Sequence, residues 1–241
     1  MEASKVILSL SGGLDSTMLM MYYLAKGYAV HAVSFEYGQK HAIEIEKASK
    51  NIKLMKDKGL PVEHQIVDLK TAFSYSASSL HEGGDEIPSG HYNDDNMKST
   101  VVENRNVIFS AIVYGIALGI AKKEDGKVII SQGVHSGDHT IYPDCRPESI
   151  AMARDLYRIS NWESERVEFE TPFVMLDKGQ VLSEGIKAME SLQFKEKEIE
   201  YVLSHTHTCY NPDKQGRPCG KCGACTERRE AFEENGRRDL L

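Results

Sequence analysis

The segment that most constrains the fold is residues 11–17, which read Ser-Gly-Gly-Leu-Asp-Ser-Thr. An apolar run at residues 6–10 precedes it and predicts a buried strand of a parallel sheet. Apolar residues then recur at helical spacing up to Ala25. The two glycines allow a sharp turn and a close approach to a ligand. Because the first amides of a helix lack partners and lie at its positive end, this unit predicts an anion site.

The loop differs from the two commonest phosphate-binding motifs. A Walker loop has Lys before its Ser or Thr, whereas Asp15 stands before Ser16 here, and the dinucleotide motif G-x-G-x-x-G is absent. The pattern Ser-Gly-Gly-x-Asp-Ser resembles instead the pyrophosphatase loop (PP-loop) of enzymes that cleave ATP to AMP and pyrophosphate. A glycine turn without a ligand is the alternative, which three neighbouring hydroxyl groups disfavour. The predicted ATP site comprises Leu8, Ser9, Leu10, Ser11, Gly12, Gly13, Leu14, Asp15, Ser16, Thr17 and Met18.

Length and charge limit the classes of function. A chain of 241 residues is sufficient for one sizeable α/β domain, with room for an appendage. A net charge of −7 provides no general attraction for nucleic acid or for an anionic membrane. The longest apolar stretch, residues 107–121, is too short and too interrupted to span a bilayer. Since the N-terminus leads straight into a core strand, we expect no signal peptide and a cytoplasmic protein.

The rest of the chain alternates between strand and helix patterns. Further strands are predicted at 30–35, 62–68, 127–131 and 167–170, and further helices at 42–58, 106–123, 148–161 and 224–235. This alternation predicts an α/β fold with a doubly wound parallel sheet of about five strands. The pattern does not give the strand order. The helix at 106–123 is apolar nearly all round, so we expect it to be central and well covered.

Polar residues gather where predicted strands end, at 37–41, 133–139 and 142–147. Ligands of open α/β sheets sit at the carboxyl ends of the strands, so we expect these turns to surround a ligand. Polar loops with nothing bound are the alternative. Arg105, at the entrance of a helix, is suited to a phosphate or carboxylate, or else it caps a neighbouring loop. The irregular stretch 74–100 is typical of a lid, a binding loop or a disordered segment.

Lys178 stands out by its place in the sequence. Asp177 and Gln180 fit a capping box, which puts Lys178 in the first turn of a helix. A cation is unfavourable there, so we expect Lys178 to face an anion unless it is simply solvated.

Four of the five cysteines lie close together near the C-terminus: Cys209, Cys219, Cys222 and Cys225. Four thiolates suit zinc, and a complete set of four leaves no open position, so the predicted site is structural. An iron–sulfur cluster and redox-active thiols are the alternatives. His205 and His207 are close enough in sequence to replace a cysteine as a ligand.

When the N-terminal loop and the C-terminal cysteines are considered together, the whole chain resembles the 7-cyano-7-deazaguanine synthases of the queuosine pathway. The resemblance rests on the PP-loop, Tyr37-Gly38-Gln39, Gly90-His91-Tyr92, Met97-Lys98, Arg105-Asn106, Gly133-Val134-His135 with Asp138, residues 142–147, Thr171-Pro172, Asp177-Lys178 and the four cysteines. One position departs from the family pattern, because Glu103 occupies a site where the family usually has Pro.

The resemblance implies a fold like that of the adenine-nucleotide α-hydrolases. Residues 1–190 would form the nucleotide-binding domain, and residues 191–241 a helical, zinc-binding extension packed on the same unit. It implies an ATP-dependent ligase, with Mg²⁺, that converts 7-carboxy-7-deazaguanine and ammonia to 7-cyano-7-deazaguanine through an acyl-adenylate and an amide. It also implies a homodimer. The catalytic candidates are Asp138, Asp144, Arg146 and Lys178, and the substrate-binding candidates are Tyr37, Gln39, Arg105, Gly133 and Tyr142.

Three other interpretations stay open at this stage. The enzyme could stop at the amide. It could be a tRNA-thiolating enzyme, which shares the loop but needs a basic face and a reactive cysteine. It could also be a nucleotide-binding module without chemistry, which the polar residues at the strand ends disfavour.

Overall fold

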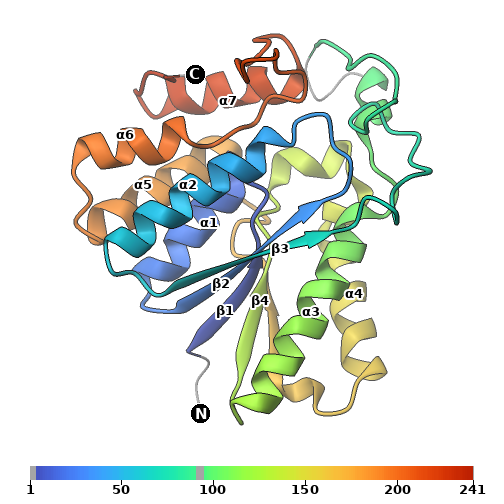
Figure 1. The fold of residues 1–241 in the computed structure, drawn as a ribbon, viewed down its shortest axis with the longest axis vertical. Helices are drawn as coiled ribbons and strands as arrows, with labels where there is room; N and C mark the ends of the chain where they lie inside the picture. Colours follow the sequence, from blue (N-terminus) through green and yellow to red (C-terminus); the bar gives the residue numbers. More distant parts are fainter. Residues whose placement is uncertain (1–3, 91–94, 241) are drawn as a thin grey trace.

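A five-stranded parallel sheet forms the centre of the computed structural model, which describes residues 4–90 and 95–240 (Figure 1). The strands are β1 (Lys5–Ser9), β2 (Ala29–Glu36), β3 (Val62–Asp68), β4 (Val128–Ser131) and β5 (Val167–Glu170). They lie in the order β3-β2-β1-β4-β5, and every neighbouring pair is parallel. The prediction of a doubly wound parallel sheet of about five strands is confirmed. His91 and Tyr92 of the family pattern lie outside the described residues.

Helices cover both faces of this sheet (Figure 1). One face carries α1 (Leu14–Ala25), α2 (Ile43–Asp57) and α5 (Lys178–Ser191), and the other carries α3 (Arg105–Lys123) and α4 (Pro147–Ser160). Side chains of β1 alternate between two hydrophobic clusters: Val6 and Leu8 pack into the first, and Ile7 into the second. Coverage of both faces is why the central strands are almost continuously apolar in sequence.

Helix α3 is less covered than its composition suggests. Val113, Ala117 and Ala121 are buried, but Ala111, Gly115 and Gly119 face solvent. The expectation of a well-covered helix was therefore wrong, because the exposed face consists of small residues that present little apolar surface. By length and composition alone, Asn96–Lys123 is the one stretch among the described residues that could cross a membrane. In the fold, α3 packs on β1, β4 and β5 as a core helix of the sheet.

The C-terminal segment continues the first cluster. It contains α6 (Glu196–Ser204), which lies beside α2, and α7 (Gly223–Glu234), which lies at the end of the sheet where the strands point (Figure 1). Val202 and Phe232 belong to the same hydrophobic cluster as β1. Arg228 on α7 is buried and binds Asp239 (2.7 Å) and the hydroxyl of Thr206 (2.7 Å). The last residues are thereby tied to the rest of the molecule.

The chain reverses its direction of winding between β1 and β4. These strands are neighbours in the sheet but are separated by two strands and three helices in sequence. A crevice forms at such a switch point because the loops that leave the two strands turn to opposite faces. Here the crevice lies between the loop after β1 and the turn after β4.

Candidate active site

The loop after β1 leaves the start of α1 open. Gly13 is the N-cap of the helix, and no side chain caps it. Gly12 has a φ of +93°, and a Cβ there would collide with the carbonyl group of Glu44. The hydroxyl of Thr17 donates to the Gly13 carbonyl (2.8 Å), which keeps the turn tight. The unsatisfied amides of α1 are therefore available to an anion, as the sequence predicts.

The turn after β4 approaches the same amides. A Cβ on Gly133 would lie 3.0 Å from the Ser16 nitrogen and 3.1 Å from the Asp15 carbonyl carbon. Any larger residue would push the turn away from the start of α1. Gly133 thus allows the two loops of the switch point to meet.

A cavity of about 190 Å³ occupies this crevice. Many of the predicted site residues line it: Ser9, Ser11, Gly13, Asp15, Ser16, Tyr37, Arg105, Gly133, Asp138, Tyr142 and Lys178. Others of the predicted loop set are buried in the fold beneath it: Leu8, Leu10, Leu14, Thr17 and Met18. His41, from the polar turn at 37–41, also lines the cavity, as do residues that the sequence reasoning missed, including Phe35, Glu44, Phe109, His207 and Tyr210.

Lys178 is buried at the end of the cavity where α1 begins. Its ammonium lies 3.3 Å from Asp15 and 2.7 Å from Glu227 of α7, and its side chain is 5% exposed. Burial opposes the charge of Lys178, but Asp15 and Glu227 outweigh it and raise its pKa above the usual value. Burial alone would raise the pKa of Asp15, yet Lys178 and His135 lower it overall. The anions that Lys178 faces are thus two carboxylates, and the predicted capping box of Asp177 and Gln180 is present.

His135 and Asp138 come from the turn after β4. The Nε2 atom of His135 lies 3.8 Å from Asp15 and 3.7 Å from Asp138, and it has no hydrogen-bond partner. Asp15 Oδ1 is also buried without a hydrogen bond. Buried polar atoms without partners indicate positions that a ligand completes.

The other end of the cavity is aromatic. Phe35 stacks on Phe109 with ring centres 4.0 Å apart, and the hydroxyls of Tyr142 and Tyr210 lie 3.0 Å from each other. Arg105 donates to the hydroxyl of Tyr37 (3.4 Å). Burial raises the pKa of Tyr37 to about 12, so this hydroxyl stays protonated. A planar heterocycle fits such a wall.

The irregular stretch that precedes α3 packs against this aromatic end. The hydroxyl of Thr100 lies 3.0 Å from that of Tyr142. Lys40 donates to the carbonyls of Gly84 and Asp85 at 2.8 Å each. Glu103, the departure from the family pattern, accepts from the hydroxyl of Ser76 (2.7 Å) and from a backbone amide. A carboxylate therefore anchors the bend here. The interpretation of this stretch as a lid stays a prediction.

Glu44, in the first turn of α2, lines the cavity between its two ends. Its Oε1 accepts from Nε2 of Gln39 (3.4 Å) and lies 3.8 Å from Nε2 of His41. Burial raises the pKa of Glu44 to about 8 and lowers that of His41 to about 3. Gln39 itself does not line the cavity; its amide is bonded to the backbone of Phe35 and Tyr37. The sequence offers no signal for Glu44, because only the fold shows that this charged residue of α2 is buried.

Three residues of the 142–147 stretch have separate structural roles. Asp144 accepts from the backbone and side-chain amides of Asn106 (3.1 and 3.2 Å), which satisfies a free amide at the start of α3. Arg146 is exposed and donates to the carbonyl of His139 (2.9 Å). Neither is among the residues that line the cavity. Cys145 does line it, but burial raises the pKa of its thiol, as expected of an unreactive cysteine.

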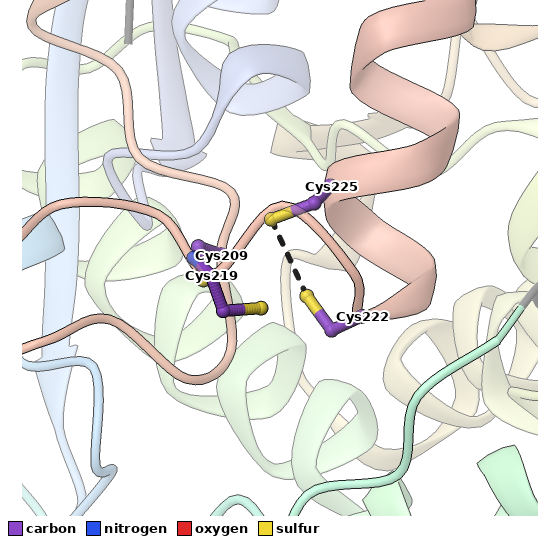
Figure 2. A group of neighbouring side chains, drawn as sticks. All are labelled: Cys209, Cys219, Cys222 and Cys225. Carbon is purple, nitrogen blue, oxygen red and sulfur yellow. Dashed lines mark hydrogen bonds between the residues drawn. The ribbon is translucent and has the colours of Figure 1, made fainter.

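The four C-terminal cysteines converge on one point (Figure 2). Their sulfur atoms all lie within 4.8 Å of one another, and those of Cys222 and Cys225 are 3.5 Å apart. Sulfur atoms around a tetrahedral metal at about 2.3 Å would lie about 3.8 Å apart, so the group fits a metal ion. The group contains no histidine, since His205 and His207 have other hydrogen bonds.

The cysteine group is linked to the cavity through the backbone. The amide of His207 donates to the carbonyl of Gly12 in the loop after β1 (2.8 Å). His207, Thr208 and Tyr210, which flank Cys209, all line the cavity. A metal at the cysteines would therefore fix one wall of the site.

Comparison with known proteins identifies similar chains over the full length. The family described as "Queuosine biosynthesis protein QueC" matches residues 5–236. The 7-cyano-7-deazaguanine synthase of Marinomonas sp. is 42% identical over 241 residues, which is 99% of this chain and 98% of the relative. That of Marinobacter nauticus is 39% identical over 236 residues, covering 98% and 96%. The solved structure of NMN synthetase from Francisella tularensis aligns at 13% identity with a TM-score of 0.42, covering 98% of this chain and 79% of that one, a similarity too low to bear on function.

The buried carboxyl of Glu44 gives a prediction about stability and pH. The folded chain keeps this proton up to about pH 8, whereas the unfolded chain releases it near 4.5. The free energy of unfolding should therefore fall as pH rises between these values. Glu44→Gln removes this loss, so the variant should match the wild type near pH 4 and be more stable at pH 8. Urea unfolding across this pH range measures the difference. Glu46→Gln, an exposed neighbour on α2, should follow the wild-type profile, and equal profiles for all three proteins would contradict the assignment.

Proposed function

The chain belongs to the family of the queuosine biosynthesis protein QueC, and we propose on this premise that it is a 7-cyano-7-deazaguanine synthase. It converts 7-carboxy-7-deazaguanine and ammonia to the nitrile at the expense of ATP. The observation that carries this proposal is the cavity itself. It brings an uncapped helix start and a buried ammonium together with an aromatic wall, which suits a triphosphate and a planar base.

The chemistry explains why such a site is needed. A carboxylate is a poor electrophile, so one of its oxygens attacks the α-phosphorus of ATP and pyrophosphate leaves. Ammonia then attacks the acyl carbon, and AMP leaves to give the amide. The amide oxygen attacks a second ATP, pyrophosphate leaves again, and loss of AMP with the two amide protons gives the nitrile. Negative charge gathers on the phosphates in both halves, where preplaced donors stabilise it.

We assign the phosphate end to ATP. The open amides of α1 and the hydroxyls of Ser11 and Ser16 would receive the pyrophosphate. Lys178 would stabilise the transferred phosphate, because its ammonium lines the cavity. Asp15 carries a buried carboxylate oxygen without a hydrogen bond, which fits the oxygen ligands that Mg²⁺ prefers, so we propose that it holds the Mg²⁺.

We propose different roles for the remaining predicted site residues. Asp138 and Gly133, at the switch point, are placed to contact substrate, as are Tyr37, Arg105 and Tyr142 at the aromatic end. Gln39 would act through the groups that it orients. Asp144 would act by holding the start of α3. Arg146 lies outside the cavity wall and would reach the substrate only from its margin.

The alternatives are less well supported. A tRNA-thiolating enzyme needs a reactive cysteine, but four cysteines are grouped together and burial raises the pKa of Cys145. The net charge of −7 also disfavours direct binding of nucleic acid. An enzyme that stops at the amide would use the same residues, so only its products distinguish it.

We propose that the cysteine group holds a structural zinc ion. All four protein ligands are present and three of them are buried, which leaves no open coordination position for chemistry. Residues 191–241 would then be an extension that zinc fixes against the nucleotide-binding part, residues 1–190. Bound zinc would hold Cys209 and, through it, the chain at 207–210 that forms a wall of the cavity.

We also propose a cytoplasmic homodimer. Helix α4 and the turn after it expose Met152, Leu156, Ile159 and Trp162, and Trp162 is 89% exposed. The three helical residues are spaced four and three apart, so they form one apolar stripe. Apolar patches of this kind are typical of contact surfaces between subunits.

The reaction is tested by incubating the chain with ATP, ammonia and 7-carboxy-7-deazaguanine. Mass spectrometry should find the nitrile, with two AMP formed for each product molecule. Lys178→Met should lower kcat by about 100-fold or more, because it removes a cation from the developing phosphate charge. Lys187→Met, on the exposed side of the same helix, should be fully active. Amide without nitrile, or a sulfur-containing product, would replace the proposal by the corresponding alternative.

The zinc proposal is tested by metal analysis and by substitution. Cys222→Ser should bind zinc more weakly and unfold at a lower temperature, because metal binding contributes to folding. Cys145→Ser should retain the metal, since this fifth cysteine is outside the group. Iron in place of zinc, or folded wild-type protein without metal, would contradict the assignment.

The dimer is tested by sedimentation. The wild type should sediment as a dimer, and Trp162→Glu should shift the equilibrium towards monomer by placing a charge beside the apolar stripe. Tyr75→Glu replaces an equally exposed aromatic residue elsewhere and should leave the dimer intact. A monomeric wild type, or no shift with Trp162→Glu, would refute this surface.

A further inference from the structure

We propose that Glu44 reads the base of the substrate: its carboxylate accepts hydrogen bonds from the ring N–H and the 2-amino group of a guanine-type edge. The inference rests on the proposed function and names the residue that selects the base. The sequence patterns did not indicate Glu44, which emerges only from the fold.

The first support is the incomplete bonding of the carboxyl group. Among the described residues, Oε1 accepts one long hydrogen bond from Gln39 (3.4 Å), while no hydrogen bond reaches Oε2. The side chain is 10% exposed and lines the cavity. A buried carboxyl group with an unused oxygen is costly, as its pKa of about 8 reflects. Two N–H donors from a ligand would satisfy it.

The second support is the rigid setting of Glu44. Oε1 of Gln39 accepts from the backbone amide of Tyr37 (2.9 Å), and its Nε2 donates to the carbonyl of Phe35 (3.1 Å) as well as to Glu44. These backbone partners fix which end of the Gln39 amide faces Glu44. The carboxyl group is therefore held by an oriented donor on one side and is open towards the cavity on the other.

The third support is the surrounding wall. Arg105 lines the same cavity and influences Glu44 electrostatically, yet among the described residues the two side chains form no ion pair within 4.0 Å. A cation and a carboxyl group that line one cavity without meeting leave a position for a polar molecule between them. The stacked rings of Phe35 and Phe109 border it, as a planar base requires.

The chemistry distinguishes the two bases of the reaction. A guanine-type edge offers two adjacent donors, N1–H and the 2-amino group, which match the two acceptor oxygens of a carboxylate. An adenine edge offers one donor and one acceptor, which match an amide instead, since Gln pairs with adenine in this way. The two donors of the base would replace the proton that Glu44 keeps in the free chain, and the carboxylate that results fits the deazaguanine base better than the base of ATP.

The test compares Glu44→Gln with the wild type. Calorimetry of 7-carboxy-7-deazaguanine should show affinity lowered by about 10- to 100-fold, the range of a lost hydrogen bond to a charged group. Affinity for ATP should be unchanged. Removal of the 2-amino group from the ligand should lower the affinity of the Glu44→Gln variant less than that of the wild type. The substitution and the change of ligand remove the same contact, so their effects should not add. Glu46→Gln, exposed on the same helix, serves as the matched control.

The outcomes separate this inference from the function. If the wild type forms no nitrile, the proposed function fails. If the wild type is active and Glu44→Gln binds the carboxylate substrate as tightly, the assignment of Glu44 fails alone. If Glu44→Gln loses affinity for ATP and retains it for the carboxylate substrate, Glu44 contacts adenine and the inference is overturned. Cooperative urea unfolding of the variant establishes that it is folded in every case.

Discussion

The buried ammonium of Lys178 is the interaction on which the rest of the site depends. It bridges Asp15 of the phosphate-binding loop and Glu227 of α7, so one charge joins α1, α5 and the C-terminal segment. Two carboxylates and one ammonium leave an excess of negative charge, which is unfavourable in a buried place and also for an incoming phosphate. A cation such as Mg²⁺ that arrives with ATP would balance this charge. Such a site would therefore suit a phosphate that brings its own metal.

The cysteine group acts on the same loop from the other side. The hydrogen bond from His207 to Gly12 connects the chain next to Cys209 with the turn that presents the α1 amides. Arg228, which is buried and paired with Asp239, holds the same C-terminal segment against Leu203 and Thr206. A structural metal at these cysteines would thus act on the site by positioning backbone rather than reacting groups.

The sequence was sufficient to predict local structure, but not to predict which distant residues the fold brings together in the site. Hydrophobic periodicity placed the strands and most of the helices within a residue or two, since burial on both sheet faces leaves continuous apolar runs in the chain, but no pattern predicted α6. The position of β4 beside β1 had no local signal, and it decides which turns form the site. Glu44 was missed because it resembles the other charged residues of an amphipathic helix, and only tertiary packing shows that it is buried. Asp144 was chosen for its carboxylate, yet that group is engaged with Asn106. The coverage of α3 was overestimated because composition does not show which small residues face solvent.

Gly12 links the geometry of the anion site to selectivity for the substrate. Gly12 has a positive φ, and the carbonyl of Glu44 occupies the space that a Cβ would need, so the loop after β1 packs directly against the first turn of α2. The distance between the anion site and the backbone of Glu44 is then set by two backbone segments in contact, and the hydrogen bond from Gln39 orients the carboxyl group. A molecule that places its carboxylate at the α-phosphate and its base at Glu44 must match that fixed distance. Selectivity for the substrate would therefore come from a backbone spacing as well as from hydrogen bonds, which is the reason for a glycine at this position in addition to the demands of the turn.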